Sequence, residues 1–498
     1  MTTLGQPDDP QDGATGRCPG SDLKAMAVVL TVGLFLRISY LDEPMRYDEA
    51  YTFNEYATRS PYDAVSLYTF PNNHLFHTLL VHVAVELFGP SPRAVRLPAL
   101  LAGLALIPAT YRMVRRLGAP RGAVLAAAFV AASNSLVSYS VNGRGYTLLC
   151  LITVLFVTAA GRIRDGGTVG DWVAFAVLPA IGYFTIPVML YPHCGVILWL
   201  LIGRSTGRTR GPRLDRLVIA FLFSSALTLI LYVPTFVRVG VKSVVMNQFV
   251  KPRPRAEVLR EMPAMFVDVW RQWNLDIPPA LVAVFVAAGA VGLVVPTPER
   301  EGARRLSGLT LTALASSIGV ALYQGVVPFG RVWLFLLPLY LGVIASGLGA
   351  VVHLASKGRT TRARGIGSAL PVLLVLGLAA LVIRSGSIPE EARWLGLNHG
   401  EVIARRLKSV LGPDDAVIAE LPCEAPLKYY FLTNNMPVQP LYDYRIARAR
   451  RLFIVVNRPN GQTPESVLAY NKVVVPAGSS PRLVEDHGLS ALYELARW

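Results

Sequence analysis

The chain is poor in charged residues for its length. Asp, Glu, Lys and Arg together make up 16% of its 498 residues, whereas 53% of the residues are hydrophobic. A soluble domain rarely combines so few charges with so much apolarity, and a single soluble core stops growing near about 250–300 residues. The scarcity of charge therefore argues against a large soluble protein, because the lipid bilayer is the solvent that suits this much apolar surface.

Cysteine is scarce as well. The four cysteines stand at positions 18, 150, 194 and 423, and no two of them form a Cys-x-x-Cys pair. This excludes a cysteine-based metal or redox motif and a disulfide framework. A secretory cleavage pattern is also missing: residues 1–22 are polar and contain several Pro and Gly. We expect them to form a disordered cytoplasmic N-terminus that precedes the first membrane span.

Acidic residues are outnumbered by basic ones. With 48 Lys and Arg against 32 Asp and Glu, the formal net charge is +16. Most of the basic residues stand in short clusters between apolar runs, a placement that reports membrane topology. We therefore predict no nucleic-acid partner and a lipid bilayer around most of the chain.

Long apolar runs are abundant. A membrane-crossing helix needs about 20 mostly apolar residues, and eleven segments qualify: 24–41, 94–111, 121–140, 146–162, 171–187, 188–203, 215–237, 279–296, 307–327, 332–352 and 366–384. The run 75–88 is short and contains two histidines and a glutamate, so we expect an interfacial helix there. The predicted fold class is an α-helical polytopic membrane protein of about eleven transmembrane helices.

The basic clusters predict the orientation of the chain. With the N-terminus inside, the inner loops at 112–121, 162–164, 204–216, 300–305 and 357–364 each carry between two and five Lys or Arg. Because positive loops stay in the cytoplasm, this pattern indicates a multi-pass protein of the cell membrane with a cytoplasmic N-terminus. The outer loop 238–278 is long and basic as well. It is either a solvated loop without topological weight or a surface that attracts an anionic lipid head group.

Residues 387–498 are no longer continuously apolar. Strand-like runs at 416–420, 452–457 and 472–475 alternate with helix-like stretches at 400–411 and 464–471, which predicts a small α/β domain. An odd number of spans places it outside the cell, on the same face as the acidic first outer loop, 42–74. We therefore expect a membrane domain over 23–386 followed by an extracytoplasmic domain over 387–498.

Two adjacent carboxylates, Asp48 and Glu49, follow the first predicted span on the outer face. If Asp48 starts a helix, its side chain can cap that helix while Glu49 lies in the favourable first turn. The alternative is that Asp48 serves as a general base at the membrane surface. The local sequence leaves both interpretations open.

Three further motifs follow in order along the chain. Pro-Asn-Asn-His ends at His74, Phe-Gly-x-Ser-x-Arg-Ala-x-Arg-Leu-Pro covers 88–98, and Arg-Gly-Tyr covers 144–146 at the outer end of the third predicted span. In this order and topology, the set resembles the bacterial branch of the GT-C superfamily of membrane glycosyltransferases. That branch is similar to protein O-mannosyltransferases and to the lipid A aminoarabinose transferase. The resemblance is good over 24–165, weaker to 352 and only architectural beyond.

The resemblance implies an enzyme that moves a sugar, a hexose or a pentose, from a polyprenyl-phosphate donor to a hydroxyl group of a glycan, lipid or protein acceptor. The acceptor hydroxyl would attack the anomeric carbon in line while the phosphate leaves. Asp48 corresponds to the acidic residue that deprotonates the acceptor, and Glu49 to a second acid that assists it. Two neighbouring carboxylates repel each other, so we expect the pKa of one of them to be raised.

The departing phosphate gains negative charge, which fixed cations stabilise. Arg144 and Arg331 stand at outer span ends and are the main candidates, with Lys242 and Arg271 as weaker ones. Both arginines also fit simple anchors that snorkel to the membrane surface. The candidates for direct contact with substrate are His74, Asn73 and Tyr146, although a lone histidine is more often structural.

A metal site has too few ligands in this sequence. Some GT-C enzymes carry a further acidic residue just after the third span and bind a divalent metal there. Here residues 143–148 contain no carboxylate, and Asp48 alone offers too few oxygens to hold such an ion. We therefore expect metal-independent transfer without a cofactor.

Two other functions compete with this hypothesis. One is a polymerase or ligase of lipid-linked glycans, and the other is a transporter or flippase of lipid-linked sugars. Transporters often show inverted repeats and charges buried at mid-membrane. In this chain no repeat is visible, and the candidate charges stand at outer span ends, which favours the enzyme.

Overall fold

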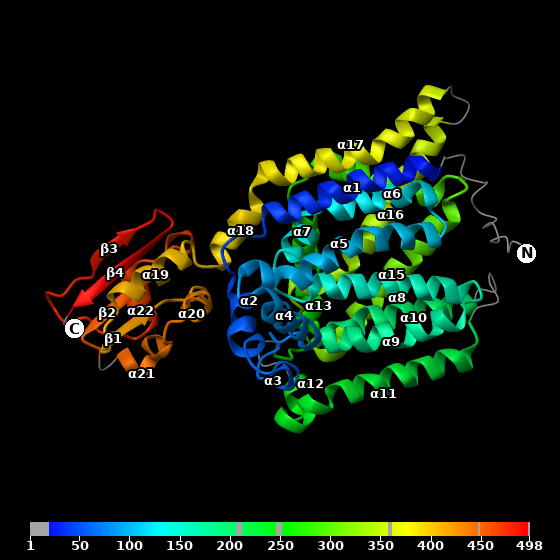
Figure 1. The fold of residues 1–498 in the computed structure, drawn as a ribbon. Helices are drawn as coiled ribbons and strands as arrows, with labels where there is room; N and C mark the ends of the chain where they lie inside the picture. Colours follow the sequence, from blue (N-terminus) through cyan, green and yellow to red (C-terminus); the bar gives the residue numbers. More distant parts are fainter. Residues whose placement is uncertain (1–18, 206–211, 246–250, 357–360, 447–448, 497–498) are drawn as a thin grey trace, which may run out of the picture.

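Long helices dominate the computed structural model, which describes residues 19–205, 212–245, 251–356, 361–446 and 449–496. Figure 1 shows these helices side by side, with a small sheet domain projecting from one end of the bundle. The described part of the chain begins with helix α1 at Pro19. The disorder predicted for the first 18 residues lies outside the described residues.

The bundle contains helices α1 (Pro19–Ser39), α5 (Pro92–Arg116), α6 (Pro120–Ala132), α7 (Asn134–Ser140), α8 (Tyr146–Arg164), α9 (Val169–Thr185), α10 (Leu190–Ser205), α11 (Leu214–Val239), α14 (Pro279–Val294), α15 (Arg300–Gln324), α16 (Leu337–Ser356) and α17 (Thr361–Ser385). Among the described residues, five helices are long and apolar enough to cross a membrane, or up to seven if each bent pair is one span. Each predicted span falls on one of these helices or on a bent pair. The polytopic fold class is thus confirmed, while the count of eleven stays a prediction.

One predicted span, 121–140, is broken in the structure. Helices α6 and α7 meet at an angle of 58°, because Ser133 between them has an extended backbone. The side-chain amide of Asn134 donates hydrogen bonds of 2.5 Å to both Asp276 and Ser387. These bonds tie the start of α7 to the loop before α14 and to the helix after α17, which stabilises the bend.

Shorter elements gather at the end of the bundle that faces the sheet domain (Figure 1). They are α2 (Tyr47–Thr52), the π-helix η2 (Phe53–Ala57), α3 (Pro61–Ser66), α4 (Leu75–Phe88), α12 (Val241–Val245), α13 (Arg255–Trp273), the 3-10 helix η4 (Gly330–Leu336) and α18 (Ser387–Leu395). A further 3-10 turn, η3 (Pro187–Met189), precedes α10. The run predicted to be interfacial is α4, and the basic loop contains the amphipathic helix α13, which exposes polar and apolar residues on different faces.

The C-terminal residues form a four-stranded sheet in the order β1-β2-β4-β3. Its elements are α19 (Gly400–Val410), β1 (Asp415–Ile418), α20 (Glu424–Thr433), η5 (Gln439–Leu441), α21 (Asp443–Ile446), β2 (Arg451–Asn457), η6 (Arg458–Asn460), α22 (Pro464–Tyr470), β3 (Arg482–Asp486) and β4 (Ser490–Ala496). Strands β1 and β2 pair in parallel, whereas β4 pairs antiparallel with β2 and β3. This confirms the predicted small α/β unit.

The third predicted strand, 472–475, is wrong. Val473 and Val475 pack against the apolar face of the sheet without joining its ladder. The missing strands are β3 and β4 nearer the C-terminus. Strand β3 lies at the edge of the sheet with an exposed or half-exposed pattern, so it lacks the apolar alternation that marks a strand in sequence.

The sheet domain is docked on the segment between α1 and α5. Lys428 on α20 pairs with Glu55 at 2.5 Å, and the side-chain amide of Asn54 donates to the carbonyl of Ala425 at 2.8 Å. The Tyr429 hydroxyl donates to the backbone of the loop before α5. The two parts of the chain therefore meet at the segment that carries Asp48 and Glu49.

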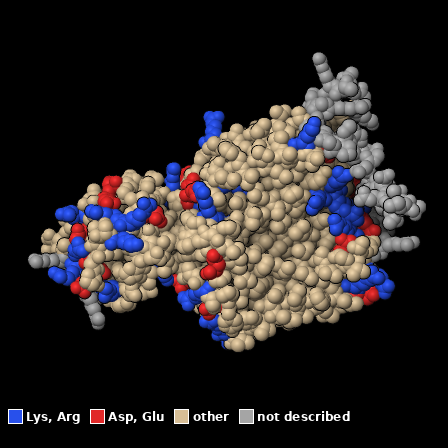
Figure 2. All heavy atoms as spheres, viewed as in Figure 1, with Lys and Arg blue, Asp and Glu red and all other residues tan. Residues whose placement is uncertain are grey.

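Charged side chains lie mainly at the two ends of the molecule. Figure 2 shows them on the sheet domain, at the junction with the bundle and at the far end of the bundle. On the face in view, a broad band without charges separates the junction from the far end. A band of this kind suits the hydrocarbon layer of a bilayer.

This separation of charge generates a test of membrane orientation. Val169 at the start of α9 and Val474 beyond α22 are 80% and 84% exposed and stand at opposite ends of the molecule. In a background with Cys18 and Cys194 replaced by serine, we expect Val474→Cys to react with an impermeant thiol reagent on intact cells and Val169→Cys to react only after lysis. The reverse labelling would contradict the predicted orientation.

Candidate active site

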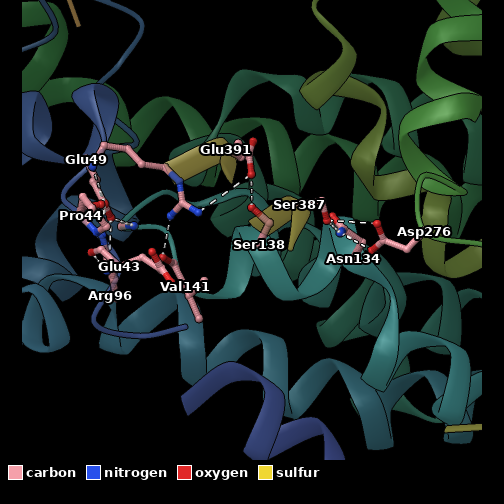
Figure 3. Close-up of polar contacts among 12 residues, drawn as sticks. Glu43, Pro44, Glu49, Arg96, Asn134, Ser138, Val141, Asp276, Ser387 and Glu391 are labelled. Atoms are coloured by element: carbon pink, nitrogen blue, oxygen red, sulfur yellow. Dashed lines mark hydrogen bonds and ion pairs between the residues drawn. The ribbon is translucent and has the colours of Figure 1, made fainter. Parts of the chain in front are cut away.

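Glu49 holds the loop after α1 to two other parts of the bundle. It is fully buried, and its carboxylate accepts hydrogen bonds from the Arg46 backbone at 2.9 Å, from the Arg96 guanidinium at 3.0 Å and from the Gly143 backbone at 2.7 Å. These donors come from the start of α2, from α5 and from the turn before α8. One carboxylate thus joins three segments that are distant in sequence (Figure 3).

Arg96, the ion-pair partner of Glu49, fixes the conformation of this loop. It is fully buried on α5, forms an ion pair with Glu49 and donates hydrogen bonds to the carbonyls of Leu41, Glu43 and Pro44 at 2.7, 2.7 and 3.0 Å. A buried charge is tolerated only when it is paired and its donors are satisfied. Arg96 meets this condition and thereby fixes the path of the chain from α1 into α2.

The glycines around Arg144 allow the turn before α8 to pack closely. A Cβ atom on Gly143 would lie 2.7 Å from Val95 and 3.2 Å from the Cβ of Glu49. A Cβ atom on Gly145 would lie 2.9 Å from Thr185 and 3.1 Å from the Cβ of His77. At both glycines the close approach is thus to neighbouring protein groups.

Glu49 does not have the pKa behaviour that was expected of an acid pair. Burial alone would raise the pKa of Glu49, but the charge and hydrogen bonds of Arg96, together with Arg46, outweigh burial and lower that pKa. Glu49 is therefore a fixed anion with its oxygens occupied. The predicted role of an acid that shares a proton with Asp48 does not fit this environment.

Asp48 is the carboxylate that remains open to solvent. Helix α2 begins at Tyr47 after Arg46, and Glu49 accepts the hydrogen bond of that N-terminus, so Asp48 is not the cap. Its side chain is 34% exposed and lies 3.2 Å from Arg144 and 3.6 Å from Arg331. The structure thus brings together the three residues to which the sequence assigned the chemistry.

The two arginines approach Asp48 from different elements. Arg144 lies in the turn before α8 and is 3% exposed, whereas Arg331 on η4 is 38% exposed. The guanidinium of Arg331 also lies 5.0 Å from the centre of the Phe329 ring. One carboxylate facing two guanidinium groups leaves this site with an excess of positive charge.

His74 contacts both the Arg144 side chain and the backbone next to it. The backbone N–H of Gly145 donates to its Nδ1 at 2.9 Å, and Nε2 lies 3.2 Å from a guanidinium nitrogen of Arg144. Burial and the charge of Arg144 lower the pKa of His74 well below its usual range, so the ring is neutral. Tyr146 packs edge-on against His74 with the ring centres 5.0 Å apart.

The asparagine at the site is Asn72 and not the predicted Asn73. The Asn72 side chain accepts a hydrogen bond from Arg144 and donates one to the backbone carbonyl of Asp48 at 3.1 Å. Asn73 is buried and donates to the carbonyls of Ala64 and Leu67 at 3.0 and 2.6 Å, which shapes the loop around α3. Both residues stand in the same motif, so only their contacts distinguish them.

Lys242 and Arg271 lie away from this cluster. Lys242 is exposed on α12, and Arg271 on α13 is 72% exposed and pairs with Asp268 at 3.6 Å. Neither side chain has a contact with Asp48, Arg144 or Arg331 among those seen for the described residues. Sequence reasoning also assigned no role to Arg96, although it is the second arginine of the motif at 88–98.

The buried ion pair generates a stability test. Removing one partner of a buried pair typically costs about 3–5 kcal/mol, because the other charge stays buried without compensation. We therefore expect Glu49→Gln to lower the thermal unfolding temperature of the detergent-solubilised protein markedly. Asp42→Asn is the matched control, since Asp42 and Arg93 form an exposed pair in the same region and exposed pairs contribute little. Equal melting temperatures for the two variants would contradict the structural role of Glu49.

A known family matches part of the chain. The model of the dolichyl-phosphate-mannose-protein mannosyltransferase family matches residues 73–229, which include Arg96, the Arg144 turn and helices α5 to α10. No curated protein sequence matches the chain.

Solved structures match almost the whole chain. ArnT from Cupriavidus metallidurans bound to undecaprenyl phosphate is 13% identical, with a TM-score of 0.61 over 96% of this chain and 98% of that one. The apo state of ArnT gives 14% identity and a TM-score of 0.59. The oligosaccharyltransferase AglB from Archaeoglobus fulgidus, in complex with an inhibitory peptide and a dolichol-phosphate, is 12% identical, with a TM-score of 0.52 over 95% of this chain and 74% of that one. Residues 73–229 thus match the model of that mannosyltransferase family, on a chain whose fold is similar to that of ArnT and AglB.

Proposed function

We propose that the protein transfers a sugar from a polyprenyl-phosphate donor to an acceptor hydroxyl on the outer face of the cell membrane. The observation that carries this proposal is the cluster in which the carboxylate of Asp48 faces the guanidinium groups of Arg144 and Arg331. The cluster stands where the bundle meets the sheet domain. The matched family and the lipid phosphates named for ArnT and AglB support the same class of donor.

Arg144 has more hydrogen-bond donors than the protein satisfies. Among the described residues its buried Nε has no hydrogen-bond partner. Because Gly145 donates to Nδ1 of the neutral His74 ring, the ring proton must be on Nε2. That N–H faces an N–H of Arg144 across 3.2 Å, which places two donors against each other. An anionic oxygen between them would accept from both, as a phosphate group does.

The arginines would act on the leaving group. As the bond between the anomeric carbon and the phosphate oxygen breaks, its electron pair stays on that oxygen and the phosphate gains charge. Cations and donors already in place bind the product phosphate more tightly than the ester, which lowers the barrier. Arg144 is held by Asn72 and Asp48, so little reorganisation is needed.

Asp48 would take the proton of the acceptor hydroxyl. In the structure its carboxylate is occupied by the two arginines, so no room for a sugar exists between Asp48 and Arg144. A phosphate that binds the same arginines competes with Asp48 for them and frees the carboxylate to accept a hydrogen bond from the acceptor. The order donor first, acceptor second follows from this competition.

The absence of a metal requirement stays a prediction. Within the described ranges, no three side chains of His, Cys, Asp and Glu converge in a way that could hold a metal ion. The groups that face Asp48 are cations, which repel a divalent ion by the same charge that attracts phosphate. We propose that Arg144 and Arg331 supply the positive charge that a divalent metal supplies in the metal-binding GT-C enzymes.

Replacing Asp48 by asparagine tests the general base. The change keeps the size of the side chain but removes its ability to accept a proton, and general base catalysis is typically worth about 10²–10⁴ in rate. We expect Asp48→Asn to lose this factor in transfer from a labelled polyprenyl-phosphate sugar while donor binding persists. Asp42→Asn, an exposed aspartate on the same face, serves as the control. A folded Asp48→Asn protein with normal turnover would end the assignment.

Neutralising the arginines tests the donor site. Hydrogen bonds to charged groups contribute about 1.5–3 kcal/mol, so we expect Arg144→Gln and Arg331→Gln each to weaken polyprenyl-phosphate binding by about 10–150-fold and to lower turnover as well. Arg271→Gln is the control, because Arg271 is exposed and paired elsewhere. If Arg271→Gln weakens binding as strongly as Arg144→Gln, the donor site lies on the basic loop and not beside Asp48.

A further inference from the structure

A groove lies between the last membrane helix and the sheet domain. Its volume is about 580 Å³, within the range of ordinary ligand sites. Ser385 and Gly386 form one end, at the break between α17 and α18. The walls come from α18 on one side and from η6 and the β3–β4 turn on the other. The groove therefore opens where a helix of the bundle leaves the predicted bilayer.

Two side chains of opposite charge line this groove, and one of them, Arg393, lies close enough to Glu43 for their charges to attract each other. Glu390 and Arg393 stand three residues apart on α18, so they share one face of the helix. Both are exposed, and neither side chain forms a hydrogen bond or an ion pair within the part of the chain that the structure describes. The third charged group, Arg458, is already neutralised, because it binds Asp486 through two hydrogen bonds of 2.6 and 2.8 Å.

Apolar side chains continue the groove toward the bundle. Trp394 in the groove wall is 52% exposed, and its neighbour Leu395 is 45% exposed. Ile383, in the last turn of α17, is 49% exposed. A tryptophan beside an arginine at the end of a membrane helix is typical of the interface between head groups and acyl chains.

We propose that this groove binds the head group of a zwitterionic phospholipid. The phosphate would pair with Arg393 and the positively charged amine with Glu390, while the glycerol and upper acyl chains would lie against Trp394 and Ile383. An anionic lipid or a free phosphate fits less well, because it would face the carboxylate of Glu390 without compensation. The charge pattern of the groove is thus complementary to one positive and one negative group in the same ligand.

The same helix reaches the catalytic loop. Glu391, the neighbour of Glu390, accepts a hydrogen bond of 2.5 Å from Ser138 and lies 3.9 Å from the buried guanidinium of Arg46. Figure 3 shows Glu391 beside Ser138, near the contacts that lead to Glu49 and Arg96. Arg46 directly precedes α2 and is two residues before Asp48. A lipid that holds α18 in place would therefore also hold Glu391, which contacts Arg46 at the start of α2.

Lipid retention by the full-length protein tests this site. The protein is reconstituted in vesicles of equal parts phosphatidylethanolamine and phosphatidylglycerol, extracted in mild detergent and analysed by native mass spectrometry. We expect retained phosphatidylethanolamine to exceed phosphatidylglycerol by about fivefold, the upper range for one exposed ion pair. Glu390→Gln should bring the ratio near one, because Glu390 reads the amine. Arg393→Gln should lower the retention of both lipids, because both carry the phosphate.

The matched controls are Glu401→Gln and Arg405→Gln on α19, which remove an exposed ion pair of the same residue types and should keep the ratio of the unmodified protein. Equal retention of the two lipids, a preference for phosphatidylglycerol, an unchanged ratio in Glu390→Gln, or unchanged retention of both lipids in Arg393→Gln would each overturn the proposal. Hydrogen exchange gives a second measurement, in which amides 387–395 should exchange more slowly in phosphatidylethanolamine than in phosphatidylglycerol, and Glu390→Gln should abolish the difference. Neither measurement depends on glycosyl transfer, so its outcome is separate from that of the proposed function.

Discussion

The buried ion pair between Glu49 and Arg96 is the interaction on which the candidate site depends. Both side chains are fully buried, so each is stable there only because the other neutralises it and the remaining donors and acceptors are satisfied. Through Arg96 the pair holds the loop that leaves α1, and through Gly143 it holds the turn that carries Arg144. Asp48 and Arg144 face each other because this one carboxylate anchors the backbone of both.

Two adjacent acids therefore have different tasks. Glu49 is surrounded by donors, which keep it ionised and fixed, while Asp48 on the next position turns toward solvent and toward two guanidinium groups. The environment of each carboxylate, and not its chemistry, makes this division. The fixed anion Glu49 holds the backbone of Asp48 in place, while the carboxylate of Asp48 itself stays open to solvent.

The sheet domain belongs to the same arrangement. It contacts the segment that carries Asp48 through Lys428 on α20 and through Glu391 on α18, the helix that connects it to the bundle. Two elements, α18 and α20, therefore contact the residues that flank α2.

The sequence by itself determined the features that depend on local composition. Apolar segments of sufficient length predicted the helical bundle, because burial of such segments in lipid needs no information from distant residues. The change in pattern after residue 386 predicted the α/β unit. The ordered motifs predicted roles for Asp48 and Arg144, and a position at an outer span end predicted one for Arg331. The fold brings these three side chains together.

Tertiary structure alone decided what depends on contacts between distant segments. The different tasks of Asp48 and Glu49 follow from Arg96 and Gly143, far along the chain, and nothing near residue 48 announces them. The choice of Asn72 over Asn73 depends in the same way on Arg144. The bend at Ser133 and the edge strand β3 are also set by their neighbours, because hydrogen bonds and burial from other segments override weak local preference there.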